Sequence, residues 1–335
     1  MSSIRGLCLI CAIILMVFFS DCAYADYYIP RESFQYKPST VFACASNQNA
    51  QEYWFSILFK RRYAIPLIYP QELTIVFHYS KETGVLSEAF RIYQRITSIV
   101  PYGEGIVFTR DHYFFVDQEL CFFPNRSKRI SVLCEPKTVG YIIAMYDHTM
   151  YYRGHSGYDD NKIYSYDFQT HDVEMLVEDA DIAFANENKL YIVNEKPMPR
   201  IDVYDRKMTF LYSNNVNSSK RILSISDEKV LMEDGKLLFL ASDDACVSPT
   251  NIELNKTIDA GWITTDYLFI VSDGRLESYK LEPPAIQQIF SQALNDDVCN
   301  IDMHFDELFL FDKNELSIRV VSIDGEEQYN IPLFP

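Results

Sequence analysis

A unit that returns about every 40 residues constrains the fold of this chain more than any other feature. In each unit an apolar run ends in a short polar turn, usually acidic, and a second apolar run follows. The six turns are Arg110-Asp111-His112, Tyr146-Asp147-His148, Asn186-Glu187-Asn188, Ser226-Asp227-Glu228, Thr265-Asp266 and Phe305-Asp306-Glu307. A fixed period of this length is typical of an array of small sheets, in which each unit packs on its neighbours.

Each unit contains four strand-like segments, which we name A to D from the axis of the array outward. The clearest unit has them at residues 141–145, 150–153, 162–167 and 173–177. Apolar and polar residues alternate in them, as expected for strands. Closing such units into a ring removes exposed sheet edges. We therefore predict an all-β fold, a β-propeller of seven four-stranded blades.

The spacing also predicts the limits of the remaining blades. They are residues 103–135, 182–213, 221–254, 261–292 and 300–333. The first blade is assigned strands at residues 40–45, 53–59, 74–79 and 86–93, with a long B–C insertion. A rival register uses Pro70-Gln71-Glu72 as an A–B turn and gives eight blades, and six blades is a further alternative. Residues 26–36 are a candidate for an additional outer strand on blade seven.

The first 25 residues have the features of a secretory signal peptide. Arg5 precedes an apolar run over residues 7–19, and Ala23-Tyr24-Ala25 fits the small-x-small cleavage pattern. An uncleaved anchor is the alternative. Residues 26–335 then form a single propeller domain, exported to the periplasm or secreted. No later segment of the chain is long and apolar enough to span a membrane.

Charge and cysteine content narrow the classes of function. The formal net charge of −17 argues against nucleic-acid binding, which needs a basic face. Five cysteines follow residue 25, and export permits disulfides. Cys121 and Cys134 flank one predicted hairpin symmetrically, which makes them a possible disulfide. The alternative is that they are buried free thiols.

Two blades carry a pattern that resembles a known class of repeat. The segments are Met150-Tyr151-Tyr152 with Lys162-Ile163-Tyr164-Ser165-Tyr166-Asp167, and Lys189-Leu190-Tyr191-Ile192-Val193-Asn194 with Arg200-Ile201-Asp202-Val203-Tyr204-Asp205. They resemble the repeats of YWTD-like propellers and of uncharacterised secreted bacterial propellers, although the full YWTD tetrad is absent. The resemblance implies a scaffold used mainly for binding, with some enzymes in the class.

The B–C loops are the predicted functional face. Three of them are long and irregular, at residues 60–72, 153–161 and 195–199, and they carry basic and aromatic residues in an acidic protein. Long loops on a rigid scaffold are where binding residues concentrate. The predicted ligand-binding residues are Arg61, Arg62, Arg153, His155, Tyr158 and Arg200. Arginine pairs with carboxylate or sulfate and tyrosine stacks on sugar rings, so the expected partner is a protein or an anionic glycan. Ordinary solvated charges are the alternative.

The sequence favours a non-catalytic protein without a metal or cofactor. The histidines lack the close spacing typical of a metal site. The alternative function is a glycan hydrolase or lyase with carboxylates in the axial funnel, where Asp302 and His304 are the polar exceptions among apolar strand-A residues. The acidic turns lie on the rim opposite the B–C loops, and we interpret them as joints of the scaffold.

Overall fold

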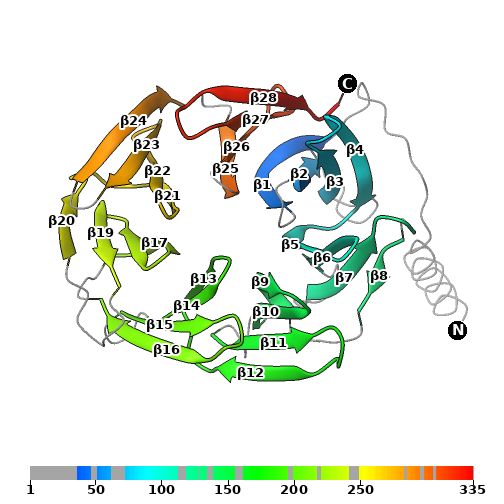
Figure 1. Cartoon of the computed structure of the whole chain (residues 1–335). Coiled ribbons are helices and arrows are strands. Elements are labelled where there is room, and N and C mark those ends of the chain that lie inside the picture. Colours follow the sequence, from blue (N-terminus) through cyan, green and yellow to red (C-terminus); the bar gives the residue numbers. More distant parts are fainter. Residues whose placement is uncertain are drawn as a thin grey trace, which may run out of the picture. The chain divides into compact units, whose positions relative to one another are not determined.

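The computed structural model describes residues 36–46, 51–61, 72–111, 118–127, 129–133, 139–154, 161–194, 199–216, 220–240, 249–282, 285–294, 298–304 and 307–334. All regular secondary structure in these residues is β-strand. The strands form seven antiparallel four-stranded sheets. The sheets stand as blades around a central axis, which confirms the predicted seven-bladed propeller (Figure 1).

Every blade takes its four strands from one continuous stretch of chain. The strands of blades one to four are β1 (Tyr36–Ser46), β2 (Glu52–Arg61), β3 (Glu72–Ser80), β4 (Val85–Ile92), β5 (Ile96–Tyr102), β6 (Gly105–Asp111), β7 (Gln118–Pro124), β8 (Ser131–Val132), β9 (Val139–Tyr146), β10 (Thr149–Gly154), β11 (Ile163–Asp167), β12 (Val173–Val177), β13 (Ile182–Ala185), β14 (Lys189–Asn194), β15 (Arg200–Asp205) and β16 (Phe210–Asn215). Those of blades five to seven are β17 (Ile222–Ser226), β18 (Lys229–Met232), β19 (Lys236–Phe239), β20 (Pro249–Glu253), β21 (Ala260–Ile263), β22 (Tyr267–Ser272), β23 (Arg275–Glu282), β24 (Ala285–Ala293), β25 (Val298–His304), β26 (Glu307–Asp312), β27 (Ser317–Val321) and β28 (Glu327–Pro332).

The predicted register is right for blade one and wrong for blade two. Blade one has its strands where they were assigned, so the eight-bladed alternative is excluded. In blade two the A–B turn lies at Gly103-Glu104, because Tyr102 pairs with Gly105 across it. Asp111 is instead the last residue of strand B, at the opposite rim. Blade two therefore begins at Ile96, in β5, and the Arg110-Asp111-His112 triplet only resembles the other turns.

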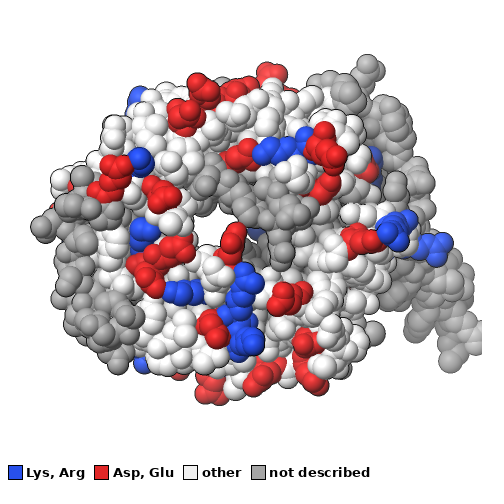
Figure 2. Space-filling view, in the orientation of Figure 1, with Lys and Arg blue, Asp and Glu red and all other residues white. Residues whose placement is uncertain are grey.

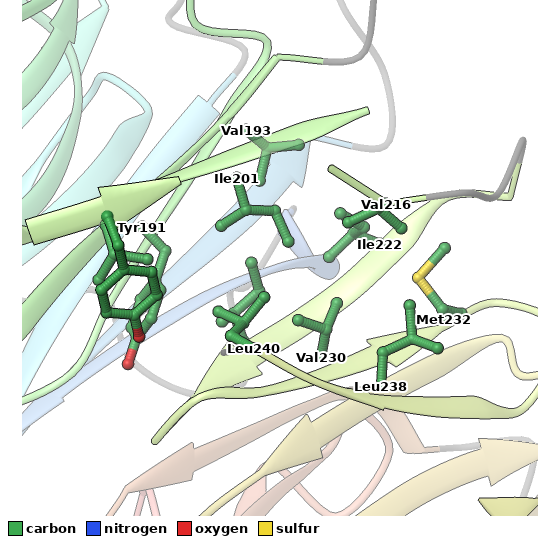
Figure 3. Close-up of a cluster of buried hydrophobic side chains, with 12 residues drawn as sticks. Tyr191, Val193, Ile201, Val216, Ile222, Val230, Met232, Leu238 and Leu240 are labelled. Atoms are coloured by element: carbon green, nitrogen blue, oxygen red, sulfur yellow. The ribbon is translucent and has the colours of Figure 1, made fainter. Parts of the chain in front are cut away.

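The hydrophobic core lies between neighbouring blades. One interface cluster of described residues joins blades four and five, and Figure 3 shows its side chains filling the space between the two sheets. Tyr191 and Val193 of β14 meet Val230 and Met232 of β18 there, and all four are fully buried. Burying one such side chain stabilises the fold by about 2 kcal/mol. Because strand residues alternate between faces, each inner strand supplies one row to each of its two neighbouring blades.

The A–B turns are joined to one another by hydrogen bonds. Tyr146 Oη donates to the carbonyl oxygens of Asn186 (2.6 Å) and Lys189 (3.0 Å) in the next blade. Asn186 Nδ2 donates to Asp227 Oδ1 (2.9 Å), and Thr265 Oγ1 donates to Asp227 Oδ2 (2.5 Å). Blades three to six are thus linked turn to turn. The interpretation of the acidic turns as joints is confirmed for Asp227.

Blades seven and one, at the two ends of the ring, meet through side chains. Glu307 accepts hydrogen bonds from Tyr53 Oη (3.0 Å), Lys81 Nζ (2.8 Å) and Tyr329 Oη (3.3 Å). The Phe309 ring lies 5.0 Å from that of Tyr53. In the described part of the chain, no strand is exchanged between these two blades. The candidate outer strand at residues 26–36 lies outside the described residues except for Tyr36, which begins β1, and the predicted signal peptide lies outside them entirely.

Candidate functional site at the B–C rim

The structure describes only part of the predicted binding face. Arg153 and Arg200 are described with their side chains, and Arg61 ends β2 with its backbone alone described. Arg62, His155 and Tyr158 lie outside the described residues. Arg153 and Arg200 both stand at the B–C rim, as predicted, because Arg153 lies near the end of a strand B and Arg200 begins a strand C.

Arg200 is held in place by a buried carboxylate. Its Nη2 lies 2.8 Å from Asp202 Oδ2, and Ser213 Oγ donates to Asp202 Oδ1 at 2.6 Å. Asp202 is 5% exposed, whereas the Arg200 side chain is 50% exposed. Ser213 faces Asp202 directly across strands β15 and β16. The guanidinium therefore has one edge fixed to the blade, and the rest of the side chain is half open to solvent.

The other described basic residues of this rim are also anchored. Arg153 Nη2 donates to Asn161 Oδ1 at 3.1 Å, across the loop that holds His155 and Tyr158. Lys60 Nζ lies 3.7 Å from Glu72 Oε1, at the two ends of the blade-one B–C connection. Such exposed pairs contribute about 0.5 kcal/mol each to stability, so their main effect is to orient the side chains.

A cation begins strand C, or in blade three directly precedes it, in four consecutive blades, and the sequence reading missed this regularity. The four residues are Lys162, Arg200, Lys236 and Arg275. An isoleucine or leucine follows each of them and points into the core. We call these four residues the cationic arc. The signal was present in the sequence as a basic–apolar pair that recurs with the blade period, but only Arg200 was selected.

The arc is anchored differently in blades five and six. Lys236 Nζ lies 3.1 Å from Asp234 Oδ2. Arg275 Nε donates to Ser291 Oγ at 2.9 Å, and Ser291 Oγ in turn donates to Glu277 Oε1 at 3.3 Å. Ser291 faces Glu277 across β23 and β24, which repeats the arrangement of Ser213 and Asp202 in blade four. Two blades thus share an Arg-x-acid sequence with a serine opposite the acid.

A second cation completes the acidic site in blade six. Lys256 Nζ lies 2.5 Å from Glu277 Oε2, and Tyr279 Oη donates to the same oxygen at 2.5 Å. Although burial alone raises the pKa of Glu277, the bonds from Lys256 and Tyr279 outweigh it, and the net pKa is below the usual value. Glu277 is therefore an ionised, fully partnered carboxylate. It is built to hold the loop of Lys256 against blade six, and not to transfer a proton.

The described residues contain no group of three or more histidine, cysteine, aspartate or glutamate side chains placed to hold a metal ion. The side chains of Asp302 and His304, the polar candidates for the funnel, lie outside the described ones. Cys121 is buried opposite Val132, and burial raises the pKa of its thiol to about 12. Its predicted partner Cys134 lies outside the described residues, so that disulfide stays a prediction. In the described part of the chain, no helix is long and apolar enough to cross a membrane.

Comparison with known proteins gives structural neighbours only. No family model and no curated protein matches the chain. The fold is similar to Hsv2 of Kluyveromyces marxianus, with a TM-score of 0.57 and 10% identity over 89% of this chain and 100% of that one. It is also similar to KlAtg21 in its complex with the coiled coil of AgAtg16, with a TM-score of 0.58 and 12% identity over 85% of this chain and 95% of that one.

A third neighbour is also a propeller domain. The β-propeller domain of the Trilobed protease from Pyrococcus furiosus has an open velcro topology, and it matches with a TM-score of 0.56 and 12% identity. The match covers 90% of this chain and 98% of that domain. At such low identity these likenesses show the fold alone. The chain is a seven-bladed β-propeller.

Proposed function

We propose that this protein is an exported, non-catalytic propeller that binds a protein or an anionic, glycan-like partner through its B–C rim. Membership of the YWTD-like or secreted bacterial propellers is part of the proposal. The cationic arc supports it: four consecutive blades present a cation at the same position. A partner with several carboxylates or sulfates can contact more than one member of the arc at once.

The arginines of the arc are held in place before a partner binds, which favours a role in binding an anion over the alternative of ordinary solvated charges. A free surface arginine loses side-chain entropy when it binds, up to about 2 kcal/mol. Arg200 has already lost part of that freedom, because Asp202 and Ser213 fix one edge of its guanidinium. No other described residue bonds the Arg200 guanidinium, so its remaining N–H groups can donate to an anion. The described part of the opposite rim holds the turn-to-turn hydrogen bonds, which leaves the B–C rim as the face able to vary without loosening the ring.

The test compares two sets of charge deletions in the full chain. The site variant is Arg200→Ala/Lys236→Ala/Arg275→Ala, and the probe is a sulfated oligosaccharide with its unsulfated form beside it. Each lost contact is worth about 0.5–1 kcal/mol, so the Kd should rise roughly 10- to 100-fold, and less in high salt. The control variant is Arg126→Ala/Lys229→Ala/Lys280→Ala, which removes three charges from the opposite rim. An equal Kd for the two variants refutes the arc as the site.

A second variant tests the predicted loop residues. In Arg61→Ala/Arg62→Ala/Arg153→Ala the cations of two B–C connections are removed together. We expect it to weaken binding of the sulfated probe and of any protein partner. If neither variant alters any measured interaction, the B–C rim is not the binding face.

A further inference from the structure

Exposed apolar side chains gather at one place on the outer perimeter of the ring. Eight large apolar side chains of the described residues are exposed, and four of them belong to β12 and β16, the outer strands of blades three and four. They are Val173, Met175, Phe210 and Leu211, between 44% and 53% exposed. Three other outer strands carry one such residue each, namely Val85, Val132 and Ile289. A cluster of this kind marks an interaction surface more often than isolated residues do.

The two outer strands belong to neighbouring blades, which are linked at the turn that precedes β16. Leu176 and Val177 of β12 share an apolar cluster with Met208, which lies in the turn between β15 and β16. Tyr151 Oη of blade three donates to the carbonyl oxygen of Arg206 in that turn, at 2.7 Å. Figure 1 shows β12 and β16 following one another along the outside of the ring. We call this surface, residues 172–175 and 206–211, the perimeter patch.

The two halves of the perimeter patch carry opposite charge. The β12 half exposes Asp172 and Glu174, and the turn before β16 exposes Arg206 and Lys207. Figure 2 shows acidic and basic side chains mixed over most of one face, with the longest run of basic ones where the blades of β9–β12 and β13–β16 meet. Within the described part of the chain, neither Glu174 nor Lys207 has an ion-pair partner. Both charges are therefore available to a partner.

We propose that a second copy of this chain docks on the perimeter patch. A two-fold axis between β12 and β16 places the acidic half of each copy against the basic half of the other. The same axis brings Phe210 and Leu211 of one copy to Val173 and Met175 of its partner. The patch is thus complementary to itself in both charge and apolarity, which is the requirement for an isologous dimer.

The overall charge favours this patch over other contacts between copies. At −17, two copies repel each other in most orientations. Association therefore needs a face on which opposite charges are brought together. A contact made by two short strands and a turn lies at the small end of stable interfaces, so we expect a dissociation constant in the micromolar range. The dimer leaves the B–C rims of both copies open, because both strands run along the perimeter.

The experiment uses charge reversal followed by mixing. Sedimentation velocity of the full chain at roughly 1–100 µM should show a concentration-dependent dimer. Lys207→Glu alone and Glu174→Lys alone should each raise the dissociation constant of the dimer at least tenfold. The reason is that each variant homodimer places like charges against each other twice. An equimolar mixture of the two variants should dimerise like the wild type, since both contacts in the mixed dimer join opposite charges again. Phe210→Ser should also abolish the dimer.

Two controls keep this result specific. Arg126→Glu reverses a charge that is 83% exposed on blade two and should leave dimerisation unchanged. Thermal melting of each variant shows that it is folded, and rescue on mixing requires folded chains in any case. A wild type that stays monomeric over the whole range overturns the proposal. So does a dimer that is indifferent to both reversals, or a mixture that does not recover.

Discussion

Glu307 joins blades seven and one by accepting hydrogen bonds from Tyr53 and Lys81, which makes its removal a sharp test of how the ring closes. In Glu307→Ala the wholly buried Tyr53 loses the Glu307 carboxylate as acceptor for its hydroxyl, at a cost of about 1–3 kcal/mol. The Lys81 ion pair is partly exposed and contributes about 0.5–1 kcal/mol, and the bond from Tyr329 adds about 1 kcal/mol. We expect a loss of about 3–4 kcal/mol in the free energy of unfolding.

For a domain of this size, that loss corresponds to a fall of roughly 5 °C in the melting temperature. Glu307→Gln retains an acceptor for Tyr53 but loses the charge, so its melting temperature should be lower than that of the wild type by roughly 2 °C. Hydrogen exchange followed by mass spectrometry should show the loss of protection concentrated in β1, β2 and β26–β28. The reason is that no peptide bond joins these blades, so the strands there separate first.

The control for this prediction is Glu228→Ala, at the junction of blades four and five. Glu228 accepts from Lys189 Nζ at 2.5 Å and from Tyr212 Oη at 3.3 Å, a closely similar contact. Those two blades are also joined by the chain itself. In Glu228→Ala the increase in hydrogen exchange should therefore stay local to the two turns. The reasoning about ring closure is wrong if Glu307→Ala has the melting temperature of the wild type. It is also wrong if Glu228→Ala increases hydrogen exchange in the strands of blades four and five as much as Glu307→Ala does in those of blades seven and one.

Three further predictions follow from the same contacts. Asn186→Ala removes the hydrogen bond to Asp227 and should lower the unfolding free energy by about 1 kcal/mol, measured by urea denaturation. Burial raises the pKa of Tyr191 to about 12 and that of Tyr146 further, above the unfolded value of about 10. Their contribution to stability is complete below pH 10 and is lost as the pH rises through the folded pKa. The urea midpoint should therefore fall between pH 10 and pH 12, and less steeply in Tyr146→Phe. If Cys121 is a thiol in the isolated protein, it should resist alkylation at pH 8 in the native state and react once the protein is unfolded. A Cys121–Cys134 disulfide would instead appear as a linked peptide in a digest under non-reducing conditions.

The architecture was readable from the sequence where turn and strand signals repeat. In blade five, Asp227 and Glu228 both adopt positive φ, of 45° and 66°, in the two-residue turn that the acidic signal marks. Blade two makes its two-residue turn at Gly103-Glu104, where Gly103 alone has a positive φ, of 55°. A search for acidic turns passes over it and settles on Asp111. The error has a simple physical cause, because glycine and a short acidic or polar side chain are alternative solutions to the same backbone requirement.

The binding face was readable only in part. Arg200 was found because it stands beside an irregular loop. Asp202 and Ser213, which hold it, are 11 residues apart, and only the strand pairing shows that they face each other. Such cross-strand pairs depend on register, which a single sequence specifies weakly for outer strands. The recurring basic–apolar pair at the start of strand C was visible without the structure, and the blade period would have located it.

Every described blade is built from one uninterrupted stretch of chain. The chain could therefore begin at any blade without changing the order of the blades around the ring. A circular permutation that joins the C-terminal end of β28 to the start of β1 and opens the chain between β16 and β17 would cut no sheet. The same independence means that a blade can be duplicated, lost or exchanged as a whole unit. Among the described residues, the number of blades in such a chain is then set by which ring closes, because no described strand is shared between its ends.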